Sequence, residues 1–186
     1  MKHFKSFVDY LKQEDNFLGS EEKETALIVL NNTEAIFIAE GTCNVDYCKN
    51  NNIPAIQLKK FSSEAGCVVG VKDDIFVVAK RKLGEDCKGI ADKWIISLCE
   101  YLKNKGLNSA KLSNNDITVD NYKVASAVET TYNGWQYISS LIAINQDIEA
   151  INNICNKPMV KVPKALIEYG ITTEEMKKFC EDYWSK

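Results

Sequence analysis

The sequence predicts one α+β domain in which helices pack on a mostly antiparallel β-sheet. Its 186 residues suffice for one hydrophobic core and are too few for two comfortable ones. Short apolar runs bounded by turn residues are typical of strands, and segments 90–105 and 172–184 carry apolar residues at helical spacing. No repeat or linker divides the chain, so we expect residues 1–186 to form a single domain.

The strands are predicted from short runs rich in β-branched and other apolar residues. The first two, 25–30 and 35–39, are separated by the turn residues Asn31 and Asn32, which predicts a hairpin. Pro54 stands near the start of the next strand, a position typical of an edge strand. Besides the hairpin described below, the remaining strands are expected at 53–58, 67–71, 75–79 and 135–144.

The helices are predicted from apolar spacing and from the residues that cap their ends. The clearest, 90–105, has one apolar face and is followed by Gly106, a typical residue after a helix. Asn44 caps a short helix that begins at residue 45, and Thr172 or Thr173 caps the C-terminal one, with Glu175 nearby. The others are expected at 4–11 and 147–155.

Composition excludes several classes of function. The net charge of −3 gives no reason to expect nucleic acid as a partner. No run approaches the ~20 apolar residues of a membrane span, and the N-terminus lacks the apolar stretch of a signal peptide. We therefore expect a cytoplasmic protein with no membrane partner.

Cysteine and histidine usage restricts the chemistry further. The seven cysteines are scattered without a C-x-x-C pair, which favours small buried hydrophobic residues over disulfides. His3 is the single histidine and lies at the N-terminus, so a histidine-based catalytic triad or metal site is excluded. No metal ligand set is predicted.

Residues 114–126 predict a hairpin that carries one lysine just after its turn. Asp120-Asn121 is a type I′ turn signal between two short alternating strands. Such a hairpin holds Asp116 and Lys123 on a rigid support. From spacing alone, Lys123 is either an ordinary solvated lysine or one that meets a carboxylate or a phosphate.

Residues 115–126 fit the pattern N-D-[I/L]-x-V-D-x-x-K-[V/I]-x-[S/G], which resembles the lysine hairpin of the lipoate-protein ligase, octanoyltransferase and biotin-protein ligase superfamily. Residues 44–54 are similar to that family's N-x-E-Y-C-x-x-N-x-I-P segment, and 106–110 and 141–148 resemble the segments on either side of the hairpin. The resemblance covers roughly residues 25–175. It implies the α+β fold of the ligase catalytic domain, and 1–186 contains no counterpart of the C-terminal accessory domain of full lipoate ligases.

The resemblance also implies an activity and a site. Lys123 would be the catalytic residue that contacts the acyl carbonyl and the phosphate of an acyl-adenylate, with Asn115 and Asp116 beside it in the substrate site. The acyl group, lipoate or octanoate, would pass to a lysine of a lipoyl domain or another acceptor protein. No covalently bound cofactor is implied, and ATP with Mg²⁺ would serve only an active ligase that forms the adenylate.

The family's glycine-rich loop, R-R-x-[S/T]-G-G-G-x-V, corresponds to residues 58–69 here. Anchored on the downstream strand, Lys59 and Lys60 replace the arginines, and Ser63, Glu64 and Ala65 replace the glycines. Glycines let backbone N–H groups approach a ligand closely. Lysine cannot form the planar, bidentate hydrogen bonds that arginine forms. By the resemblance, the substrate-binding candidates in this loop are Lys59, Lys60, Ser62, Ser63 and Gly66.

The register of this loop has an alternative. Anchored on Pro54, the family's arginines fall on Gln57 and Leu58 instead. In either register the triple glycine is missing. Three interpretations therefore stay open: an active acyl ligase or transferase, a catalytically inactive module that serves as a structural or protein-binding component, and a small-molecule binder.

Three further features have both a functional and a structural interpretation. Cys67 could form a thioester, but a buried structural thiol is favoured because no base is visible to activate it. The basic run Lys80-Arg81-Lys82 is expected to be a solvated strand end. Three aromatic residues could line an acyl pocket, although core packing is the commoner role. These are Tyr132, Trp135 and Tyr137.

Overall fold

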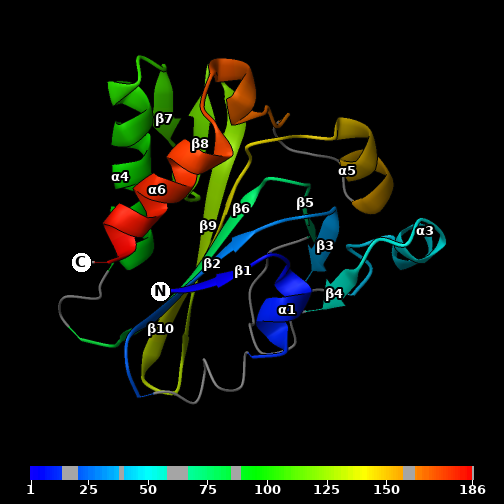
Figure 1. Cartoon of the computed structure of the whole chain (residues 1–186), viewed down its shortest axis with the longest axis horizontal. Coiled ribbons are helices and arrows are strands. Elements are labelled where there is room, and N and C mark those ends of the chain that lie inside the picture. The colour runs from blue at the N-terminus through cyan, green and yellow to red at the C-terminus, as the bar shows by residue number, and fades with distance from the viewer. Residues whose placement is uncertain (14–20, 38–39, 58–66, 85–88, 157–161, 186) are drawn as a thin grey trace.

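A seven-stranded sheet forms the centre of the computed structural model, which describes residues 1–13, 21–37, 40–57, 67–84, 89–156 and 162–185 (Figure 1). Its strand order is β1-β2-β6-β10-β9-β8-β7, and β1 and β2 are the neighbours that run parallel. The strands are β1 (Lys2–Phe4), β2 (Glu24–Val29), β6 (Ile75–Lys82), β7 (Ser109–Lys111), β8 (Asp116–Val119), β9 (Tyr122–Tyr132) and β10 (Trp135–Ile142). A mostly antiparallel sheet with helices packed on it confirms the predicted α+β class.

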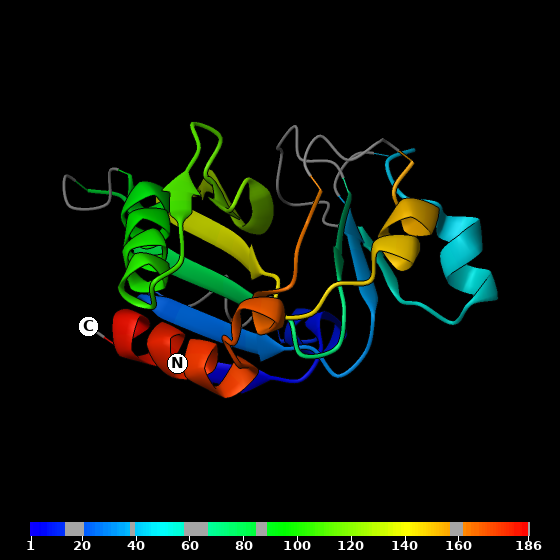
Figure 2. The same ribbon diagram turned by 90° about the horizontal axis from the view of Figure 1, so that it is seen from above.

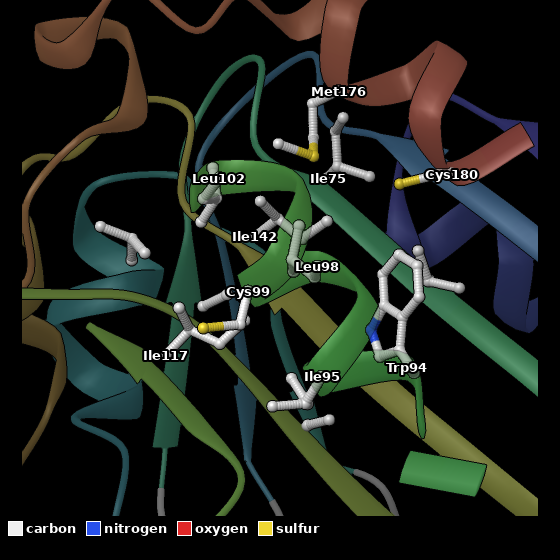
Figure 3. Close-up of a cluster of buried hydrophobic side chains, with 14 of the residues drawn as sticks. Ile75, Trp94, Ile95, Leu98, Cys99, Leu102, Ile117, Ile142, Met176 and Cys180 are labelled. Carbon is white, nitrogen blue, oxygen red and sulfur yellow. The ribbon is translucent and has the colours of Figure 1, made fainter. Parts of the chain in front are cut away.

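Helices α4 (Ile90–Asn104) and α6 (Thr173–Trp184) pack on one face of this sheet (Figures 1 and 2). Figure 3 shows their apolar side chains packed with those of the strands, with Met176 beside Ile75. Trp94 is fully buried there and donates its Nε1–H to Ser140 Oγ at 2.9 Å. Its ring stacks on Phe179 at a centroid distance of 5.7 Å. Trp94 therefore connects both helices to the sheet.

The short helix α1 (Phe7–Leu11) packs on the opposite face of the sheet. Phe7 and Tyr10 are buried against residues that include Ile28 and Phe76. The helix begins at Ser6, whose hydroxyl accepts the Asp9 N–H at 3.0 Å.

A second, three-stranded sheet has the order β4-β3-β5 and lies at the end of the molecule away from α4 (Figures 1 and 2). Its strands are β3 (Glu34–Phe37), β4 (Ala55–Gln57) and β5 (Cys67–Gly70). Helices α3 (Val45–Asn50) and α5 (Ile148–Ile154) pack on it around a small apolar core. The 3₁₀ helix η2 (Leu166–Tyr169) precedes α6.

The helices with clear caps are confirmed. Asn44 accepts the Tyr47 N–H at the start of α3, and Gly106 follows α4 with a φ of +85°. At the start of α6, Thr172 and Glu175 form the reciprocal capping box. These capping signals involve only neighbouring residues, so they do not depend on how distant segments pack.

The predicted hairpin of 25–30 with 35–39 is wrong. β2 pairs with β1 and β6 in the large sheet, whereas β3 pairs with β4 and β5 in the small one. Neither Asn31 nor Asn32 has the positive φ of a type I′ turn. Instead, the N–H and C=O of Leu30 are bonded to Asp74 and Asp73, respectively, so the chain leaves the large sheet here.

The N-terminal helix is shorter than predicted. Residues 2–4 form β1, which pairs in parallel with 26–28 of β2, and the helix begins only at Phe7. Strand β7 and helix η2 were not predicted, because each is too short to show a periodic pattern. The predicted strand residues 38–39 and 58 lie outside the described part of the chain.

The expectation that Lys80 is solvated is wrong, although Lys82 at the strand end is exposed. Lys80 lies between β2 and β10 and is fully buried, with its Nζ 4.3 Å from the ring centroid of Trp135. Burial lowers the pKa of Lys80. The run of basic residues does not show which of them is paired with strands on both sides.

In the part of the chain that the structure describes, no helix combines the length and apolar character needed to cross a membrane.

Candidate functional site

The lysine hairpin forms as predicted, from β8 and the first residues of β9. Asp120 and Asn121 have φ values of 50° and 70°, the left-handed pair of a type I′ turn. The pairing register shifts between Ile117 and Thr118, which marks a β-bulge. The turn and the bulge together fix where the side chains after the turn point.

Asp116 and Lys123 share the face of the hairpin that points away from the α4–α6 core. Ile117 and Val119 are fully buried in that core. Because side chains alternate along a strand, Asp116 and Thr118 lie on the opposite face. Lys123 is the pairing partner of Thr118, so its side chain lies on this face as well.

Lys123 and Asp116 form an ion pair. Lys123 Nζ lies 2.8 Å from Asp116 Oδ1, and the second carboxylate oxygen accepts a hydrogen bond from Asn114 Nδ2 at 2.8 Å. The Asp116 side chain is 9% exposed and that of Lys123 is 36% exposed. An ammonium carries three donors, so Lys123 can keep Asp116 and still donate to a carbonyl or phosphate oxygen of a ligand.

The backbone of Lys123 is held from the other side by a segment far along the chain. Its N–H donates to the C=O of Val162 at 3.1 Å, and its C=O accepts the N–H of Lys164 at 3.0 Å. Together they form a parallel bridge with Pro163. Sequence reasoning missed this support, because 162–164 has no strand pattern that could have indicated it.

Asn115 precedes Asp116 in the chain and has an unpaired side-chain acceptor. Its backbone is satisfied, since its N–H donates to Leu112 and its C=O accepts from Ala127, but its φ is +59°. Its Oδ1 is buried and has no hydrogen-bond partner within the described ranges. An unmatched buried acceptor costs about 1–3 kcal/mol of stability.

The structure thus brings together two predicted site residues, Asp116 and Lys123, while Asn115 is placed beside them only as the chain neighbour of Asp116. The other candidates, and with them the two possible registers of the loop, lie in 58–66, outside the described residues. They are Lys59, Lys60, Ser62, Ser63 and Gly66.

The remaining candidates are Cys67 and the three aromatic residues. Hydrogen bonding with Cys155 and burial both raise the pKa of the Cys67 thiol. Tyr137 is buried and Trp135 lies against Lys80, as core packing predicts, while the side chain of Tyr132 is not among those described. Among the described residues, no three His, Cys, Asp or Glu side chains are placed to hold a metal ion.

A pocket of about 590 Å³ opens elsewhere, where β1 and the start of β2 meet the end of α6. Arg81 and Trp184 line it, and none of the predicted site residues does. The guanidinium of Arg81 lies 5.0 Å from the Trp184 ring centroid and donates to the C=O of Glu24 at 3.0 Å. This pocket is formed by groups that are already engaged with one another.

Comparison with known proteins gives matches in structure only. No protein-family model and no curated protein sequence matches the chain. Lipoate-protein ligase A, solved with ATP, shares 14% identity at a TM-score of 0.77, with 96% of this chain and 79% of that one covered.

Two further structures come from named organisms. The bi-partite lipoate protein ligase of Thermoplasma acidophilum shares 12% identity at a TM-score of 0.73, covering 95% of this chain and 79% of that one. P. falciparum LipL1, in complex with lipoate, shares 16% identity at a TM-score of 0.68, covering 99% and 62%. At these identities the matches show the fold: this chain has the α+β architecture of lipoate-protein ligases.

Proposed function

We propose that this protein transfers a lipoyl or octanoyl group to a lysine of a carrier domain, and that Lys123 is its catalytic residue. The observation that carries the proposal is the Lys123–Asp116 pair at 2.8 Å, set on a rigid hairpin within a lipoate-ligase fold. Relatives in fold have been solved with ATP and with lipoate.

The chemistry needs a positive charge at the acyl carbonyl. When the acceptor lysine attacks this carbon, negative charge develops on the carbonyl oxygen and then on the leaving group. The Lys123 ammonium donates to that oxygen, and Asp116 holds it in place before the substrate arrives. Preorganised donors of this kind commonly supply a factor of ~10²–10³ in rate.

We favour transfer from a preformed acyl donor over activation of free lipoate. In either register of the loop that would meet the nucleotide phosphates, the family's arginines and triple glycine are lost and Glu64 lies in or near the loop. A carboxylate there repels phosphate, and a Cβ keeps the backbone N–H groups away from it. A donor that is already activated, such as an acyl-adenylate or an acyl carrier thioester, demands less of this loop.

The same departures favour a second candidate function, a catalytically inactive module. Asp116 already neutralises Lys123, and without a phosphate-binding loop the pair can serve as a structural ion pair. Such a module would bind a protein partner through the ligase fold. The Thermoplasma acidophilum ligase, a neighbour in fold, is bi-partite.

The test supplies an apo lipoyl domain with each of three donors: lipoyl-adenylate, an octanoyl carrier protein, and lipoate with ATP and Mg²⁺. Intact-mass spectrometry measures acylation by the wild type and by Lys123→Ala. We expect labelling from a preformed donor and its loss in the variant. If the folded wild type labels nothing with any donor, the acyl-transfer proposal is wrong.

A further inference from the structure

Four cysteines from three separate segments come together in the layer formed by the small sheet and helices α3 and α5. Cys43 precedes α3, Cys48 lies within it, Cys67 begins β5 and Cys155 follows α5 (Figure 1). All four belong to or pack against one apolar cluster, and all four thiols are free. Residues 43 and 155 are 112 positions apart, so the fold rather than the local sequence assembles this group.

Two of these cysteines face each other across an antiparallel bridge. Cys43 and Cys155 are its paired residues, and the bonds on either side run from Asn44 N–H to Ile154 O at 2.7 Å and from Asn156 N–H to Thr42 O at 3.0 Å. The Cys43–Cys155 pair is therefore the non-hydrogen-bonded kind, whose Cα atoms lie ~4.5 Å apart with their side chains close together. That spacing falls within the ~4.4–6.8 Å range of disulfides.

The four thiols differ in access and reactivity. Cys67 and Cys155 are both half-buried. The Cys155 thiol donates to the C=O of Cys67 at 3.8 Å, and interaction with the Cys67 thiol lowers the pKa of Cys155 against the opposing effect of burial. Cys48 is fully buried, and burial raises its pKa to about 12. Cys43 Sγ lies 3.9 Å from Cys48 Sγ and is 5% exposed. Of the two half-buried thiols, Cys155 is the one that faces Cys43 across the bridge and the one whose pKa is lowered.

We propose that Cys155 and Cys43 form a reversible oxidation site for hydroperoxides, separate from the Lys123 site. The Cys155 thiolate attacks the peroxide, so that an S–O bond forms, the O–O bond breaks and hydroxide leaves. The Cys43 thiol then attacks the sulfenic sulfur, forming the disulfide, and the S–O bond breaks with loss of water. In sum, two thiols lose two electrons and two protons, and one hydrogen peroxide becomes two waters. Cys67 is a positioning residue that stabilises the thiolate.

The test treats the reduced, folded wild type with hydrogen peroxide, blocks the remaining thiols and maps the peptides by mass spectrometry. We expect the loss of two thiols per chain, one linked peptide pair containing residues 43 and 155, and full reversal by dithiothreitol. The oxidised chain should also melt several degrees higher, since the new bond closes a loop of about 110 residues. This readout does not depend on acyl transfer.

Variants separate the roles. Cys155→Ser should abolish the fast oxidation, and Cys43→Ser should stop it at a sulfenic acid on Cys155 that dimedone traps. Cys67→Ala should slow oxidation without changing the linked pair, whereas Cys67→Ser keeps a donor and should restore the rate. Cys99→Ser is the matched control, because Cys99 is buried beside Ser109 in the core between the large sheet and helices α4 and α6. Circular dichroism verifies that each variant is folded.

Several results would overturn the proposal. A linked pair of Cys67 with Cys155, or of Cys43 with Cys48, would assign the bond to other thiols. Thiols that react only after denaturation would show that the site is closed to oxidants. One bound zinc per chain, with all four thiols protected until chelation, would make the cluster a metal site instead.

Discussion

Lys123 Nζ lies 2.8 Å from the carboxylate of Asp116, on the face of the β8–β9 hairpin that points away from the α4–α6 core. The two residues are seven positions apart in sequence, and the type I′ turn and the bulge between them set the distance. The ammonium of Lys123 is therefore in place before any ligand binds.

Removing the carboxylate should impair positioning more than binding. In Asp116→Ala, Lys123 loses its partner and samples several rotamers, so the rate constant of acyl transfer should fall by roughly 10-fold or more. Asp116→Asn keeps an acceptor and should lose less. The control is Asp92→Ala, which breaks the 3.0 Å pair between Asp92 in α4 and Lys111 on the neighbouring strand β7. Equal losses in Asp116→Ala and Asp92→Ala would argue against a specific role.

The type I′ turn should also be needed to position Lys123. Asn121 has a φ of 70°, which a β-branched residue tolerates poorly. Asn121→Val should therefore cost roughly 1–2 kcal/mol of unfolding free energy and displace Lys123. Asn121→Gly should retain both stability and activity. Urea denaturation measures the first effect, and a stable, fully active Asn121→Val would contradict the account.

Asp74 should make stability depend on pH. It accepts N–H bonds from Val71, Ile144 and Asn145 at 2.8–2.9 Å and is fully buried. Burial raises the pKa of Asp74 to about 7 from its ordinary 3.8, outweighing those donors. The folded state then binds the proton more tightly than the unfolded one. The resulting stability is complete below about pH 4 and is lost as pH rises through 7.

Asp74→Asn provides the comparison. Its amide nitrogen would oppose the Val71 N–H or another donor, so we expect a loss of about 1–3 kcal/mol. The advantage of the wild type over this variant should shrink between pH 5 and pH 8 in urea titrations. An advantage that grows with pH would show that Asp74 is ionised in the folded protein and stabilised by its donors.

Gly70 should resist substitution on steric grounds. A Cβ there would lie 2.5 Å from Leu30 Cδ1 and 2.7 Å from Phe76 Cε2, both buried in the apolar cluster that contains Phe7 and Tyr10. Gly70→Ala should cost about 1–3 kcal/mol as these side chains shift. Gly84→Ala is the control, since no described atom lies within 4 Å of the place that a Cβ would take there, and it should be neutral. Equal thermal stability of the two variants would contradict the packing.

Local signals in the sequence predicted most elements and the hairpin that carries Lys123. Helix caps such as Asn44 and Thr172, and the turn Asp120-Asn121, act over a few residues, so they could be read without knowing the fold. Pairing between distant segments could not be predicted from such local signals. β2 and β3 are both largely buried, and nothing in their composition shows that they belong to different sheets.

The same limit applies around the site. The Asp116–Lys123 pair follows from one hairpin, whereas the support from Val162 and Lys164 comes from a segment about 40 residues downstream. The burial of Lys80 follows from its strand neighbours rather than from its basic flanks. The six cysteines that the structure describes are free, and the gathering of four of them from three segments has no signature in spacing.

The central claim is that Lys123 carries acyl transfer, and single-turnover kinetics test it most directly. A preformed acyl donor and an apo lipoyl domain are mixed with excess enzyme, and the mass of the domain is followed over time. Lys123→Ala should slow transfer by on the order of 10²-fold or more, while Lys111→Ala, which removes a paired lysine from the adjacent strand β7, should leave it unchanged. Equal rates in the wild type and Lys123→Ala would contradict the account.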